Sequence, residues 1–324
     1  MMKTTAQYRH RLPQQNGALF LTDGGIETCL IFDDGLELPL FAAFPLMRDA
    51  EGRQALTQYY ERFIEIARRN ALGFVLESPT WRASADWGAR LGYSLAEISA
   101  ANTDAIALMQ ELREAHETPA SPMVVSGCIG PRGDGYVPGE IMSEETAEAY
   151  HALQVDAFAD AGADMVSAIT MTSTSEAIGI TRAARRAGMP VAISFTVETD
   201  GRLPTGQTLK AAITRVDAAT ANAPAYYMLN CAHPSHFEGA IDPEQPWTQR
   251  LGGLRANASR RSHQELNDSP DLDAGDPLEL GHQYRDIVRA NPQINVLGGG
   301  CGTDHRHVEC IALACKPARQ SRIA

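Results

Sequence analysis

Short apolar runs alternate with longer amphipathic stretches along most of this chain. Eight runs of four residues are rich in β-branched or other apolar side chains, and helical spacing of apolar residues fills much of the sequence between them. The pattern predicts strands at residues 19–22, 74–77, 123–126, 165–168, 191–194, 226–229, 251–254 and 294–297. It also predicts helices between most strands, including residues 54–70, 94–114, 144–161, 175–187 and 278–290.

The alternation of strands and helices predicts a parallel sheet, and the apolar strands predict that helices cover it. Eight such units are the number that closes a (β/α)₈ barrel. An open doubly wound sheet is the alternative, but no Gly-x-Gly-x-x-Gly segment follows the first strand. We therefore predict an α/β protein, a single TIM-barrel domain over residues 1–324. A polar, irregular excursion at about 255–277 is expected to cover the barrel mouth or to form an oligomer contact.

Composition excludes several classes of protein. The formal net charge is −12, so binding of nucleic acid through a basic face is not expected. No apolar run reaches the roughly 20 residues that cross a bilayer, so no membrane association is expected. Six cysteines are scattered through the 324 residues, which is typical of a reduced, cytoplasmic protein rather than one held by disulfides.

Polar and thiol side chains gather where the predicted strands end. Asp23 follows the first strand, Thr170 the fourth, Asn230 and Cys231 the sixth, and Cys301 the eighth. In a barrel, the loops that follow the strands share one face, which is the face that carries active sites. We therefore expect these five side chains to converge on one pocket.

The residue types in this set suggest particular chemistry. Two cysteines at two strand ends indicate a thiolate metal site or a reactive thiol, although buried cysteines often only pack the core. Asp23 is a candidate for binding a ligand, and it is equally suited to capping the next turn. Two further acids, Glu77 and Glu198, lie at strand ends and are expected either to face the pocket or to pair with an arginine.

The glycine-rich segment 298–302 allows a second interpretation. Tight turns after the last strands of a barrel often bind phosphate groups, which would indicate an enzyme acting on a phosphorylated small molecule. No lysine lies near this segment, and the chain is acidic. Both observations argue against a phosphate site.

Five segments occur in a characteristic order and spacing, each at the end of a predicted strand or just beyond it. They are 23–25 (DGG), 126–131 (SGCIGP), 194–206 (SFTVETDGRLPTG), 230–231 (NC) and 298–302 (GGGCG). Together they resemble the motifs of the homocysteine S-methyltransferase family, which includes betaine- and S-methylmethionine-dependent enzymes. The resemblance runs from about residue 20 to residue 312 and implies a (β/α)₈ barrel.

The resemblance also implies a zinc site made by three cysteines, one after strand six and an adjacent pair after strand eight. The first and last of these positions match Cys231 and Cys301, whereas the middle position is Gly300, which has no side chain. The family usually has Glu-Thr after strand four, and this chain has Ile169 followed by Thr170. The sequence thus departs from the family pattern at one metal position and one substrate position.

The activity that the resemblance implies is transfer of a methyl group from a small sulfonium or ammonium donor. The acceptor would be the zinc-activated thiol of homocysteine, or a related thiol or selenol. Asp23 would contact the ammonium group of the substrate, and Thr170 and Asn230 would orient the substrate. The resemblance also implies that this protein could form a homo-oligomer.

The missing third cysteine leaves three alternatives. A histidine, His233 or His305, would complete the zinc coordination, or zinc would bind weakly with water in the gap. In the third alternative the barrel is catalytically silent or repurposed, and it binds an amino-acid-like ligand without methylating it.

Overall fold

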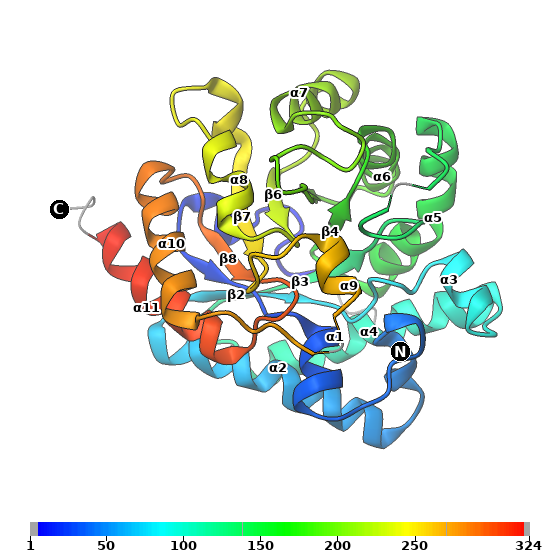
Figure 1. The fold of residues 1–324 in the computed structure, drawn as a ribbon. Helices are drawn as coiled ribbons and strands as arrows, with labels where there is room; N and C mark the ends of the chain where they lie inside the picture. The colour runs from blue at the N-terminus through cyan, green and yellow to red at the C-terminus, as the bar shows by residue number, and fades with distance from the viewer. Residues whose placement is uncertain (1–5, 138, 270, 321–324) are drawn as a thin grey trace.

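The computed structural model describes residues 6–137, 139–269 and 271–320. Its eight parallel strands form a closed barrel in which each strand pairs with its neighbours in sequence and the last pairs with the first (Figure 1). The strands are β1 (Phe20–Leu21), β2 (Gly73–Glu77), β3 (Met123–Ile129), β4 (Met165–Met171), β5 (Val191–Phe195), β6 (Tyr226–Asn230), β7 (Leu251–Ala256) and β8 (Val296–Gly299). Each overlaps one of the eight predicted runs, so the predicted (β/α)₈ barrel is confirmed.

Long helices surround the barrel on its outside, and short ones lie in the connections that follow the strands (Figure 1). In chain order the helices are α1 (Ile26–Thr28), α2 (Ala50–Asn70), α3 (Ala85–Arg90), α4 (Leu95–His116), α5 (Glu144–Ala161), α6 (Thr174–Arg186), α7 (Leu209–Thr220), α8 (Pro234–Phe237), α9 (His263–Asn267), α10 (Pro277–Ala290) and α11 (His305–Gln320). The five helices predicted from the sequence correspond to α2, α4, α5, α6 and α10. Among the described residues, none of the helices combines the length and apolar character that crossing a bilayer requires.

Two apolar layers hold the barrel together. Successive side chains of a strand point to opposite faces, so neighbouring residues enter different layers. In β2, Val75 belongs to a cluster with Phe20 and Val124 in the barrel interior, whereas Phe74 packs with the layer beneath the helices. All four side chains are at most 1% exposed. Both faces of the strands are therefore apolar, which explains why the strands lack polar alternation in the sequence.

The segment between β7 and α10 runs at the mouth of the barrel. It contains the short helix α9, which begins with a capping box formed by Ser262 and Glu265. His263 and Leu266 of this helix line a cavity together with Cys301 from the loop after β8. The polar excursion expected from the sequence therefore adjoins the strand ends that carry the candidate site.

Candidate active site

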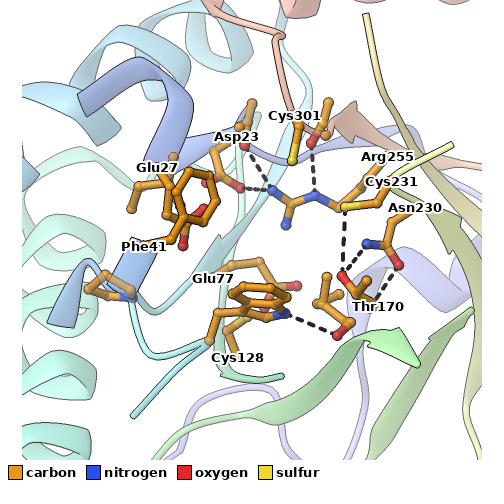
Figure 2. A pocket seen from close by; sticks show the side chains of 18 of the residues that line it. Asp23, Glu27, Phe41, Glu77, Cys128, Thr170, Asn230, Cys231, Arg255 and Cys301 are labelled. Atoms are coloured by element: carbon orange, nitrogen blue, oxygen red, sulfur yellow. Dashed lines mark hydrogen bonds and ion pairs between the residues drawn. The ribbon is translucent and has the colours of Figure 1, made fainter. Parts of the chain in front are cut away.

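A cavity of about 710 Å³ opens at the carboxyl ends of the strands. All five site residues predicted from the sequence line it: Asp23, Thr170, Asn230, Cys231 and Cys301 (Figure 2). They come from β4 and β6 and from the segments that follow β1, β6 and β8. The barrel therefore brings together residues that are up to 278 positions apart, as the shared face of the loops predicts.

The two thiols interact closely. A hydrogen bond from Cys301 to the sulfur of Cys231 lowers the pKa of Cys231 to about 5 against the opposing effect of burial. The same contact raises the pKa of Cys301 well above its usual value. Thr170 Oγ1 lies 3.7 Å from Cys231 Sγ, and Tyr136 Oη lies 3.2 Å from Cys301 Sγ. Of the two thiols, Cys231 is therefore the one that loses its proton more readily.

Asn230 fixes the geometry around Cys231. Its Oδ1 accepts hydrogen bonds from the backbone N–H of Thr170 (2.9 Å) and from Ser194 Oγ (2.6 Å), while its Nδ2 donates to Thr170 Oγ1 (2.8 Å). Thr170 and Cys231 both have left-handed backbone, with φ of 67° and 54°. Residues other than glycine rarely adopt this conformation unless their surroundings enforce it. Asn230 therefore positions Thr170 through contacts within the protein.

Asp23 is part of a buried ion pair that sequence reasoning missed. Its Oδ1 accepts a hydrogen bond from Arg255 Nη2 at 2.7 Å, and its Oδ2 accepts one from Tyr59 Oη at 2.9 Å. Arg255 also donates through Nε to the carbonyl oxygen of Gly299, 3.2 Å away. Burial raises the pKa of Asp23, although the charge of Arg255 opposes this effect. Both carboxylate oxygens of Asp23 thus already accept hydrogen bonds from protein groups.

Two further acids face the cavity. Glu77, the last residue of β2, is 3% exposed, and its Oε2 has no hydrogen-bond partner within the described part of the chain. Glu27 on α1 has its pKa raised to about 7 by burial. Glu198, the other strand-end acid considered from the sequence, instead lies with its Oε1 3.3 Å from Nδ1 of His263.

Tyr136, which lines the cavity, packs against His263 of α9. Their ring centroids lie 4.1 Å apart, and His263 Nε2 donates a hydrogen bond to the carbonyl oxygen of Cys231. Neither residue lies in a segment with clear hydrophobic periodicity, so the sequence pattern did not indicate them. The signal that could have found His263 was its place in the excursion expected to cover the mouth.

Comparison with known proteins decides the family. The sequence profile described as homocysteine S-methyltransferase matches residues 20–315, which is most of the chain. This chain belongs to the homocysteine S-methyltransferase family. No curated protein sequence matches the chain significantly.

Solved structures agree with this family in fold. The oxidized form of the homocysteine methyltransferase MmuM from Escherichia coli superposes with a TM-score of 0.73 at 19% identity, covering 92% of this chain and 96% of that chain. The metallated form of the same enzyme gives a TM-score of 0.71 at 18% identity, with the same coverage of both chains. At this level of identity, the likeness establishes a shared fold.

Neither His233 nor His305 lines the candidate cavity, which argues against the alternative in which one of them completes the zinc coordination. His233 caps the start of α8, with its Nδ1 2.8 Å from Ser235 Oγ, and it lines a different cavity beside Asp273. His305 is exposed at the first position of α11. Across residues 6–137, 139–269 and 271–320, no three His, Cys, Asp or Glu side chains are placed to hold one metal ion.

Gly300, which occupies the middle position of the family cysteines, is tightly enclosed. A Cβ atom at this position would lie 2.6 Å from Asn257 Oδ1 and 2.7 Å from the carbonyl oxygen of Arg255. Contacts this short require a shift of the β7 end, which is backbone rather than a flexible side chain. The absence of a side chain at Gly300 thus allows the end of β7 to pack closely against the loop after β8.

Placing a cysteine at position 300 is consequently expected to destabilise the fold. We predict that Gly300→Cys lowers the free energy of unfolding by about 1–3 kcal/mol, because overpacking forces a backbone shift. Urea denaturation followed by circular dichroism measures this change. Gly239→Cys is the matched control, since a Cβ at that exposed glycine meets nothing within 4 Å. Equal stability of Gly300→Cys and the wild type would contradict the packing argument.

Proposed function

We propose that this chain is a cytoplasmic enzyme that transfers a methyl group from a small sulfonium or ammonium donor to the thiol of homocysteine or a related thiol or selenol. The observation that carries the proposal is the pair formed by Cys231 and Cys301, whose side chains line one cavity at the carboxyl ends of the strands. Membership of the homocysteine S-methyltransferase family supports the same reaction.

The two sulfurs of the cavity are ligands of the type that zinc prefers, one fewer than the three protein ligands usual at catalytic zinc sites. Cys231 and Cys301 would hold the ion. When bound, Zn²⁺ lowers the pKa of a coordinated thiol, which otherwise stays mostly protonated at neutral pH. Among the described residues, the structure provides no third His, Cys, Asp or Glu for this set, so we propose a site with two protein sulfurs.

Neighbouring side chains prepare the two thiols for this role. Thr170 Oγ1 faces the Cys231 sulfur, where its hydroxyl stabilises negative charge by donating a hydrogen bond. Burial and the two sulfurs raise the pKa of Tyr136 well above its usual value, so its phenol stays protonated and can donate to Cys301. The ring of Tyr136 is in turn held by its contact with the ring of His263.

The cavity walls suit a positively charged methyl donor. Phe41, Tyr60, Trp81 and Tyr136 line the cavity, and aromatic faces attract sulfonium and quaternary ammonium groups. Trp81 is held in place by a hydrogen bond from its Nε1 to the carbonyl oxygen of Ile169 at 3.1 Å. Much of the acceleration would come from holding donor and thiol in line, because this removes the entropic cost of bringing them together.

A silent or repurposed barrel is the second candidate function. It is favoured by the closed packing around Gly300, which leaves no space for a third sulfur in the present backbone. Such a protein would bind an amino-acid-like thiol in the same cavity and release it unchanged.

An assay of methionine formation distinguishes the two candidates. The zinc-supplemented protein is incubated with L-homocysteine and with S-methylmethionine, S-adenosylmethionine or betaine in turn. We expect methionine with at least one donor and none when the donor is omitted. Absence of product with all three donors, together with measurable homocysteine binding, would instead support the silent barrel.

A further inference from the structure

Some of the charged side chains around the cavity have ion-pair or hydrogen-bond partners within the protein, and others lack them. Three carboxyl groups, from Asp23, Glu27 and Glu77, face it together with the guanidinium groups of Arg82 and Arg255. Asp23 has both oxygens bonded to protein donors, one of them Arg255, so its charge is neutralised where it lies. The two other acids, Glu27 and Glu77, have no ion pair with an arginine among the described residues.

Glu77 is the most deeply buried of these remaining acids. Its backbone carbonyl accepts a hydrogen bond from Tyr60 Oη at 2.7 Å, which fixes the end of β2 at the cavity wall. Its side chain points into the cavity (Figure 2) and is 3% exposed, and Oε2 finds no hydrogen-bond donor among the described residues. Burial raises the pKa of Glu77, while the charge of Arg255 and hydrogen bonds from Ser167 and Ser126 oppose the rise.

A buried carboxylate oxygen without a donor is costly, and such atoms are usually satisfied by another group. The missing partner must be an N–H or O–H donor. A sulfonium or a quaternary ammonium group carries no N–H, so betaine offers Oε2 no donor, and S-methylmethionine or S-adenosylmethionine could satisfy it only through its own primary ammonium group. A primary ammonium group provides both the positive charge and the hydrogen-bond donors.

We infer that Glu77 binds the primary ammonium group of the amino-acid thiol that enters this cavity. The inference rests on the proposed function, because it takes the acceptor to be homocysteine or a related amino acid. It makes Glu77 a residue that determines acceptor specificity, selecting amino-acid thiols over simple thiols. The strand that supplies this charge is β2, while β4 presents Ile169 and Thr170 to the same cavity.

Glu27 provides a matched comparison. It carries the same carboxyl group on the wall of the same cavity, but its surroundings differ. The charges that act on it include Arg82, Asp23 and Cys231, whereas those that act on Glu77 include Arg255 and Asp23. A general need for negative charge in the cavity would make the two acids equivalent. A specific contact between Glu77 and the ammonium group would instead make only Glu77 important for the preference.

Isothermal titration calorimetry of the zinc-supplemented, full-length protein tests the inference. The two probes are L-homocysteine and 4-mercaptobutanoate, which is homocysteine without its amino group. We expect the wild type to bind L-homocysteine roughly 10- to 100-fold more tightly than 4-mercaptobutanoate, because a charge-assisted hydrogen bond contributes about that much to affinity. Glu77→Gln should abolish this preference, and Glu27→Gln should retain it.

The outcomes separate the inference from the proposed function. Equal affinity of the wild type for both probes would overturn the role of Glu77 while leaving thiol binding intact, and this comparison requires no variant to fold. Retention of the preference in a folded Glu77→Gln, or its loss in Glu27→Gln as well, would also overturn it. Failure of the wild type to bind either thiol would contradict the proposed function itself.

Discussion

Replacing Arg255 with methionine is expected to lower the free energy of unfolding by about 3–5 kcal/mol, because it leaves a buried charge without its partner. The Asp23 side chain is only 3% exposed, and Arg255 Nη2 lies 2.7 Å from its Oδ1. In the variant, Tyr59 Oη would remain as a hydrogen-bond donor to this carboxylate, with no positive charge beside it. Urea denaturation monitored by circular dichroism measures the loss.

The origin of that loss can be tested with a second variant. The double variant Asp23→Asn, Arg255→Met removes both charges, and we expect it to recover a substantial part of the stability. Arg260→Met is the matched control, because Arg260 pairs with Glu279 on the exposed surface, where ion pairs contribute about 0–1 kcal/mol. A double variant less stable than Arg255→Met alone would show that the buried charge is not the cause.

The second large effect is expected on zinc binding and methyl transfer when a cysteine of the proposed zinc site is replaced. We predict that Cys301→Ser reduces bound zinc from about one ion per chain to nearly none and slows methyl transfer at least about 100-fold. The substitution removes one of the two proposed sulfur ligands. Elemental analysis after dialysis and the methionine assay measure the two quantities.

Cys310→Ser is the control for this experiment. Cys310 lies on α11, where it is partly buried, and it does not line the candidate cavity. Its replacement should leave zinc content and methyl transfer near the wild-type values. If Cys301→Ser kept its full zinc content, the proposed pair of sulfur ligands would be wrong.

The barrel was predictable because its strands are buried on both faces. Phe74 and Val75 are neighbours in β2 that enter different apolar layers, so their segment appears as one apolar run rather than an alternating pattern. Eight such runs, each followed by polar or thiol residues, were enough to predict the fold. They also placed Asp23, Thr170, Asn230, Cys231 and Cys301 at one face, where the cavity lies.

What the sequence could not provide was the set of contacts between distant strands. Arg255 and Asp23 are 232 residues apart, and no periodic pattern links them. The proximity of His233 to Cys231 in sequence was misleading, since the chain turns after β6 and uses His233 to cap α8. Tyr136 reaches Cys301 from a loop after β3, and its place depends on tertiary packing alone.

The left-handed backbone at Thr170 and Cys231 sets a limit on how robust this barrel can become. Each such residue costs on the order of 1–3 kcal/mol, which the surrounding hydrogen bonds must offset. Glycine at position 170 would relieve the backbone strain, but it would also delete the hydroxyl that accepts a hydrogen bond from Asn230 and faces the Cys231 sulfur. The hydroxyl beside the Cys231 sulfur therefore requires a backbone conformation that lowers the stability of the fold.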